Sequence, residues 1–217
     1  MVMVKTETKN NVIIITKNDG NSVIDLNLKD KVYLMIDLNN ITNLKKLIKK
    51  IRKNTKDYEK EKFALLIKSN GDKEFENDVI SCINAALCKN RKERIEYIYD
   101  TVCSYLDEEF RKNNYCDFKN DVCKAKRNCK EVVKMGCCHK VKNLLKGKLV
   151  ECPLLKNKTC STSCITCKLF TCDAIDRKFK LKDIPLINIY FDPIQKFIIK
   201  TSFFTTRETI INRLLHW

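Results

Sequence analysis

Ten of the thirteen cysteines of this 217-residue chain lie between Cys116 and Cys172. Zinc and iron-sulfur clusters are both bound by cysteine thiolates, and both take cysteines in sets of four. Such a site needs several thiols close together, and the run Cys160-x3-Cys164-x2-Cys167 is short enough for one turn to provide two or three. Nine cysteines are predicted to be metal ligands: Cys116, Cys123, Cys137, Cys138, Cys152, Cys160, Cys164, Cys167 and Cys172.

The rest of the sequence favours metal over disulfides as the partner of these thiols. The amino terminus is polar almost at once, and the longest apolar runs, such as Val12 to Ile15, are far too short to cross a bilayer. We therefore expect a soluble, cytoplasmic protein without a membrane span, in which thiols stay reduced. The odd number of cysteines also fits poorly with complete disulfide pairing.

Several residues of similar chemistry stay outside the predicted ligand set. Cys129 lies in a polar, basic stretch and His139 directly follows Cys138, so for each of them the sequence leaves ligation open. The remaining three cysteines occur within helical patterns and are interpreted as packing or surface residues. These are Cys82, Cys88 and Cys103.

Three motifs in the cysteine region form a recognisable order: Gly136-Cys137-Cys138, Cys152-Pro153-Leu154-Leu155 with Cys160, and Cys167-Lys168-Leu169-Phe170-Thr171-Cys172. On these motifs the chain resembles the YkgJ-like cysteine-cluster family of zinc- or iron-chelating proteins, over about residues 116–172. Its upstream pair is stretched to Cys116-x6-Cys123, and Lys168 stands where the family usually has arginine. The resemblance implies zinc or an iron-sulfur cluster as cofactor and transfers no enzymatic activity.

The formal net charge of +16 indicates an anionic partner, either an acidic protein or a nucleic acid. Thiolates reduce this charge, because two tetrathiolate centres would lower the formal charge of residues 116–172 from +9 to +5. A basic group near the cluster, formed by Lys124, Lys126, Arg127 and Lys130, allows two interpretations. It either balances thiolate charge or contacts phosphate in a zinc-supported nucleic-acid-binding module.

The chemistry of an enzyme is harder to assemble from this sequence. It contains two histidines and no glycine-rich phosphate loop, so we predict no catalytic residues. The leading hypothesis is an intracellular metal-binding protein that holds zinc or an iron-sulfur cluster. Two alternatives stay open: the nucleic-acid-binding module, and an iron-sulfur component of a redox or methyl-transfer system.

The secondary structure expected along the chain, which would position these thiols, indicates an α+β, helix-rich fold in three parts. Residues 1–70 form a small β-containing region, residues 71–115 a helical segment, and residues 116–217 a metal-organised cysteine domain with helices at its end. The turn residues Ser69 to Asp72 mark the first boundary.

Local patterns predict the individual elements. Strands are expected at residues 11–17 and 22–28, as a hairpin around Asn18 to Asn21, and also at 31–38 and 63–68. Apolar periodicity predicts helices at residues 41–53, 73–87 and 95–106, the first with a basic outer face. Residues 194–201 fit a helix or a strand, and a capping-box pattern at Thr205 to Glu208 predicts a last helix.

Overall fold

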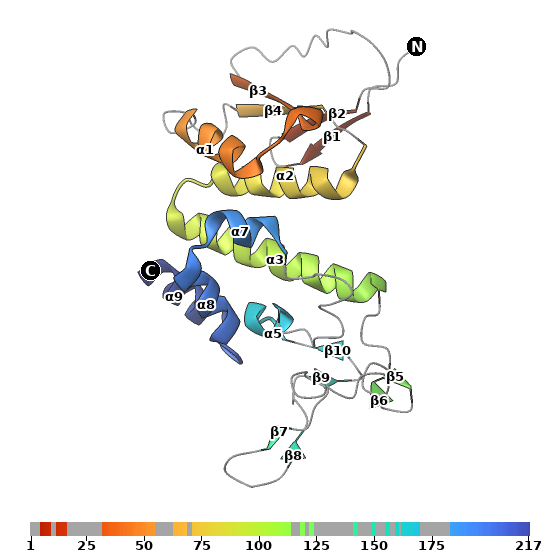
Figure 1. Ribbon diagram of the computed structural model, residues 1–217, viewed down its shortest axis with the longest axis vertical. Helices are drawn as coiled ribbons and strands as arrows, with labels where there is room; N and C mark the ends of the chain where they lie inside the picture. Colours follow the sequence, from red (N-terminus) through yellow and green to blue (C-terminus); the bar gives the residue numbers. More distant parts are fainter. Residues whose placement is uncertain are drawn as a thin grey trace. The chain divides into compact units, whose positions relative to one another are not determined.

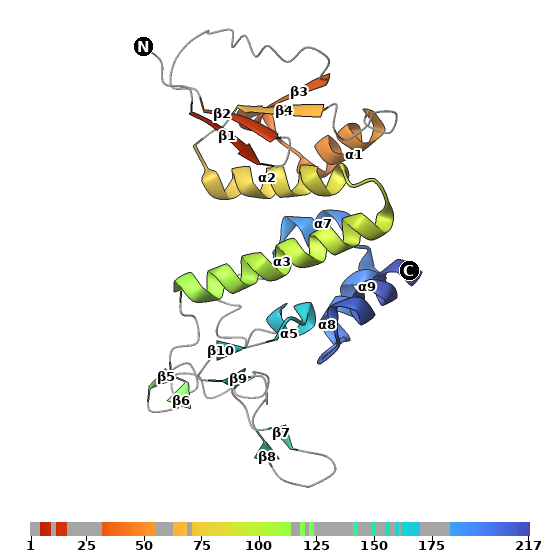
Figure 2. The same ribbon diagram turned by 180° about the vertical axis from the view of Figure 1, so that it is seen from behind.

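The computed structural model describes part of the chain, and it separates into two compact units, Met1–Arg94 and Ile95–Trp217. The described residues are 5–9, 12–16, 32–54, 63–68, 71–113, 118–119, 122–123, 141–142, 149–150, 155–156, 159–160, 162–169 and 183–217. Figures 1 and 2 show the two units from opposite sides. The predicted division at residues 70 and 115 stays a prediction, because compactness does not test independent folding.

The first unit contains a four-stranded sheet in the order β1-β2-β4-β3. β1 (Lys5–Lys9) pairs antiparallel with β2 (Val12–Thr16), and β4 (Phe63–Lys68) lies parallel to both β2 and β3 (Val32–Asp37). β3 and β4 pair in parallel because a helix between them carries the chain back to the start of the next strand. At their ends Lys68 Nζ lies 3.1 Å from Asp37 Oδ2.

The strand predicted at residues 11–17 is confirmed as β2, but its antiparallel partner in the sheet is β1. The two strands pair from Lys5 with Thr16 to Lys9 with Val12. The predicted partner, residues 22–28, and the turn at residues 18–21 lie outside the described residues. The strands predicted at 31–38 and 63–68 correspond to β3 and β4.

Two helices lie on one face of this sheet and contact each other, α1 (Leu44–Asn54) and α2 (Lys73–Ala86) (Figure 1). α1 begins later than the periodicity predicted because a short 3-10 helix, Leu38–Asn40, comes first and the Asn43 side chain then accepts the Lys46 amide at 3.0 Å. Asp72 is the N-cap of α2, and its carboxylate accepts the amides of Glu74 and Phe75. Its residues Val79 and Ile83 are fully buried.

The long helix α3 (Arg91–Asn113) begins at the boundary and supplies most of its length to the second unit. Its apolar face is buried, with Ile98 and Val102 fully inaccessible. Four shorter helices follow in the described part of this unit: α5 (Ile165–Leu169), α7 (Pro185–Tyr190), α8 (Pro193–Thr201) and α9 (Arg207–His216). α8 contacts both α5 and α9 (Figure 2).

Residues 194–201, which the sequence left between helix and strand, form α8. The Asp192 carboxylate accepts the Gln195 amide at 2.8 Å, and the Gln195 side chain accepts the Asp192 amide, a reciprocal capping box. Proline at the first helical position supports the same start. α7, which the periodicity did not predict, also begins with a proline.

Three two-residue antiparallel ladders are found among the described residues of the cysteine region. β5 (Phe118–Lys119) pairs with β6 (Val122–Cys123), β7 (Val141–Lys142) with β8 (Leu149–Val150), and β9 (Leu155–Lys156) with β10 (Thr159–Cys160). The described residues are mainly helical, which agrees with a helix-rich α+β fold at the coarse level. No described helix is both long and apolar enough to cross a membrane.

Candidate metal centre

The predicted ligands fall into three groups in the structure. Cys164 and Cys167 are described with their side chains, whereas Cys123 and Cys160 are described by backbone alone, at the ends of β6 and β10. The other five predicted ligands lie outside the described residues: Cys116, Cys137, Cys138, Cys152 and Cys172. Cys129 and His139 lie outside them as well.

Cys164 and Cys167 stand on one turn at the start of α5. The Cys164 amide donates to Thr162 Oγ1 at 3.0 Å, and the Lys168 amide donates to the Cys164 carbonyl, which closes the first helical turn. Side chains three apart on a helix are neighbours, so this spacing places the two thiols side by side. Both are buried, at 2% and 8% exposure.

The surroundings of the Cys164 sulfur favour its thiolate form. Hydrogen bonds from the Cys167 thiol and amide and from the Thr205 amide outweigh burial and lower the pKa of Cys164 to about 4. The Ser202 carbonyl, 3.4 Å from the same sulfur, acts in the opposite sense because only a protonated thiol donates to it. A stabilised thiolate is the form that binds a metal ion.

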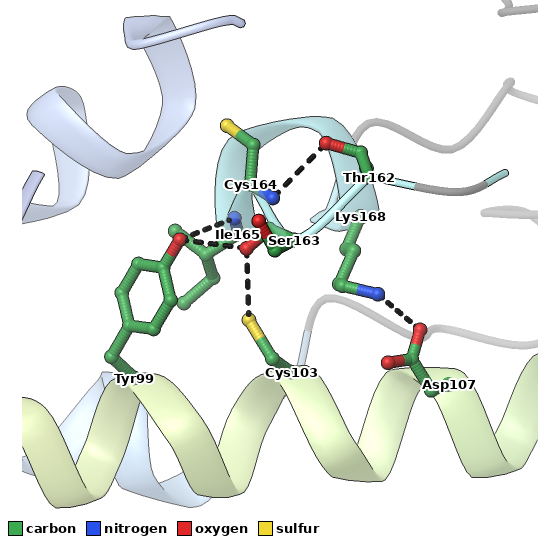
Figure 3. Close-up of polar contacts among 8 residues, drawn as sticks. All are labelled: Tyr99, Cys103, Asp107, Thr162, Ser163, Cys164, Ile165 and Lys168. Atoms are coloured by element: carbon green, nitrogen blue, oxygen red, sulfur yellow. Dashed lines mark hydrogen bonds and ion pairs between the residues drawn. The ribbon is translucent and has the colours of Figure 1, made fainter. Parts of the chain in front are cut away.

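The loop before α5 is fixed by one stripe of α3 (Figure 3). The Tyr99 hydroxyl donates to the Ser163 carbonyl at 2.8 Å and accepts the Ile165 amide at 3.1 Å. Cys103, one turn further along α3, places its sulfur 3.9 Å from the same Ser163 carbonyl. Another turn on, Asp107 forms an ion pair with Lys168 of α5.

The stripe of Tyr99, Cys103 and Asp107 was missed by sequence reasoning, which assigned Cys103 to packing or surface. The three residues are spaced i, i+4 and i+8, a signal that they share one face of α3. Burial is the main reason why the pKa of Cys103 rises to about 12. Its thiol is therefore protonated near neutral pH, unlike that of Cys164.

The connection between α8 and α9 covers Cys164. Thr205 Oγ1 lies 3.9 Å from the Cys164 sulfur and donates to the Ser202 carbonyl at 2.6 Å. Between them Phe204 has a φ of 56°, a left-handed conformation that is uncommon outside glycine. Because the Thr205 hydroxyl bonds to Ser202, the N-cap of α9 is Thr206, whose hydroxyl accepts the Thr209 amide at 3.3 Å. The predicted capping box therefore starts one residue too early.

The first residue of α9 ties this helix to α3. Arg207 Nε and Nη2 donate to the two carboxylate oxygens of Asp100 at 2.7 and 2.6 Å. The same guanidinium lies 5.9 Å from the centre of the Tyr99 ring. The side chain that orders the α5 loop is thus itself held by α9.

The cysteines on the other helices differ from the pair on α5. Cys82, fully buried in α2, has its pKa raised to about 12 chiefly by burial, and the buried thiol of Cys88 donates to the Asn84 carbonyl at 3.4 Å. Both act as packing residues, as the helical pattern indicated. His216 is exposed at the end of α9.

A zinc or iron-sulfur centre requires more ligands than the pair on α5 provides. In the part of the chain that the structure describes, no three histidine, cysteine, aspartate or glutamate side chains are placed to hold a metal ion. Cys164 and Cys167 fit two positions of a tetrathiolate set, by their burial, their spacing and the thiolate character of Cys164.

Comparison of the chain with models of protein families, with curated proteins and with solved structures found no match. The resemblance to the YkgJ-like family stays a prediction from the three cysteine motifs.

Proposed function

We propose that this chain is a metal-binding protein that holds zinc or an iron-sulfur cluster through its cysteine region. The observation that carries the proposal is the buried pair Cys164 and Cys167 at the start of α5, with the pKa of Cys164 lowered to about 4. A thiolate is the form of cysteine that coordinates a metal ion, so a deprotonated Cys164 beside a second buried cysteine favours metal binding.

The remaining ligands in this proposal come from the other seven predicted cysteines. Of these, Cys160 ends β10 and lies four residues before Cys164 in sequence, close enough to contribute a third sulfur. Bound metal would link these segments to α5, and metal binding would then be part of the folding of residues 116–172. Zinc or a cluster would act there as a structural or electron-storing centre.

The test is metal analysis of protein purified without oxygen. We expect zinc in a colourless sample, or iron and sulfide in equal amounts in a brown one, at one or two centres per chain. Cys164→Ser and Cys167→Ser should each lower the metal content by about one centre. Cys88→Ala is the matched control, since this buried thiol bonds within the first unit, and it should leave the metal content unchanged.

Protein that contains neither zinc nor iron in stoichiometric amount would contradict the proposal. Full metal occupancy in both serine variants would likewise remove Cys164 and Cys167 from the ligand set.

A further inference from the structure

The outer face of α1 carries the densest positive charge among the described elements, far from any cysteine in sequence. Six of its eleven residues are lysine or arginine, all six are exposed, and the helix contains no acidic residue. They are Lys45, Lys46, Lys49, Lys50, Arg52 and Lys53. None of the six forms an ion pair with another described residue.

This arrangement opposes the stability of the helix itself. Lys45, Lys49 and Lys53 follow one another at i, i+4 and i+8, and each like-charged neighbour pair costs about 0.2–0.5 kcal/mol. Lys45 and Lys46 also stand in the first turn, where the helix dipole disfavours cations. α2 shows the opposite pattern, with Glu74 and Glu76 in its first turn. Arg52 and Lys53 in the last turn are favourably placed for the helix dipole, but among the described residues no acidic side chain pairs with the other four cations. A local rule broken in this way is typical of a functional surface.

We propose that the basic face of α1 binds the phosphate backbone of a nucleic acid, without sequence preference. An α-helix rises about 1.5 Å per residue, so six charges on eleven residues give about one positive charge per 3 Å. Duplex DNA carries one negative charge per ~1.7 Å of its axis, a density of the same order. Lysines, five of the six cations, contact phosphate as point charges and read base edges less often than arginine.

Two other partners fit this face less well. A membrane-bound amphipathic helix inserts its apolar side into lipid, but Ile48 and Ile51 of α1 are each 2% exposed within the first unit. Protein interfaces are depleted of lysine and enriched in aromatic residues, and the exposed face of α1 has no aromatic residue. The proposal is independent of the metal, because it concerns an element of the first unit only.

The test measures binding of the full-length protein to a fluorescein-labelled random-sequence 30-base-pair DNA by fluorescence anisotropy, from 50 to 200 mM salt. The variant Lys45→Gln/Lys49→Gln/Lys53→Gln removes one stripe of the face. We expect its affinity at 100 mM salt to fall at least tenfold, and its log–log salt slope to fall by about 2–3. The variant Lys45→Arg/Lys49→Arg/Lys53→Arg keeps the charge and should bind like the natural chain.

The matched control removes the same charge from three exposed lysines on other helices, as Lys73→Gln/Lys92→Gln/Lys200→Gln. It should change the affinity by less than twofold, and circular dichroism should show all variants folded. Equal weakening in the control would overturn the proposal, since net charge alone would then explain binding. So would absence of DNA binding at 50 mM salt, or α1-dependent binding to phosphatidylserine vesicles without binding to DNA.

Discussion

The surroundings of the cysteine side chains in this chain shift their pKa values in opposite directions. Hydrogen bonds from Cys167 and Thr205 lower the pKa of Cys164 to about 4, whereas burial raises the pKa of Cys82 and of Cys103 to about 12. Donors aimed at a sulfur stabilise its charge, and an apolar surrounding without such donors destabilises it. At the residue scale, the structure thus separates a thiol suited to a metal from thiols suited to packing.

A carboxylate of the first unit provides a pH test of the same reasoning. Burial, followed by the charges of Glu74 and Asp72, raises the pKa of Asp78 to about 6 from 3.8. Because the folded pKa is the higher one, the neutral acid stabilises the fold below about pH 4, and this contribution is lost as the pH rises through 6.

We therefore expect Asp78→Asn, which imitates the neutral acid, to raise the free energy of unfolding at pH 7. The gain should be about 1 kcal/mol, because the carboxylate is only half buried and water screens it. Urea denaturation at pH 7 and at pH 4 measures the effect. The difference between variant and natural chain should be several times smaller at pH 4 than at pH 7, and a pH-independent difference would contradict the assignment to ionisation.

At the scale of elements, α3 organises the second unit. One of its stripes fixes the loop before α5 through Tyr99, Cys103 and Asp107, and Asp100 binds Arg207 at the start of α9. α8 and α9 are joined in addition by a buried bond, since Gln195 Nε2 donates to the Leu214 carbonyl at 3.0 Å. A short helix such as α5 has little stability of its own, so these contacts decide whether it forms.

The Tyr99 hydroxyl is predicted to be the main contact between α3 and the α5 loop. Tyr99→Phe removes the partner of the Ile165 amide and one donor to the Ser163 carbonyl, both at a site with 1% exposure of Tyr99. We expect a loss of about 1–3 kcal/mol in the free energy of unfolding. Tyr97→Phe, on the same helix but only partly buried, is the control and should change it by less than 0.5 kcal/mol. Equal effects of the two substitutions would contradict the role of the hydroxyl.

At the scale of the whole molecule, the predicted metal ligands and the basic helix belong to different compact units. The nine predicted ligands are all in the second unit, and α1 is in the first. If metal binding is part of the folding of the cysteine region, its removal should affect one unit and spare the other.

This separation predicts a local response to metal loss, which hydrogen exchange can measure. Removal of zinc by a chelator, or of a cluster by air and a chelator, should speed amide exchange in α5 by tenfold or more. Exchange in α2 should stay unchanged, because its buried residues Val79 and Ile83 pack in the first unit. Equal acceleration in α2 and α5, or no acceleration in α5, would contradict the prediction. This test presupposes the proposed metal centre, whereas DNA binding by α1 does not.

The sequence by itself determined the features that depend on neighbours along the chain. The helix start at Asp72 follows from a side chain that bonds two or three residues ahead, and the basic face of α1 follows from periodicity. The prediction of Cys164 and Cys167 as a pair follows from their spacing. Residues close in sequence have few alternative arrangements, so capping residues, periodicity and spacing are enough to predict these local features.

Only the tertiary structure decided which distant segments meet. It gave β2 the partner β1, placed Tyr99 against Ser163, 64 positions away, and joined Arg207 to Asp100 across 107 positions. It also placed Thr205 beside the Cys164 sulfur, where the Thr205 amide adds to the larger effect of the hydrogen bonds from Cys167 that lower the pKa of that thiol. These pairings depend on how whole helices and strands pack, because a side chain can satisfy its hydrogen bonds with many partners until the fold selects one.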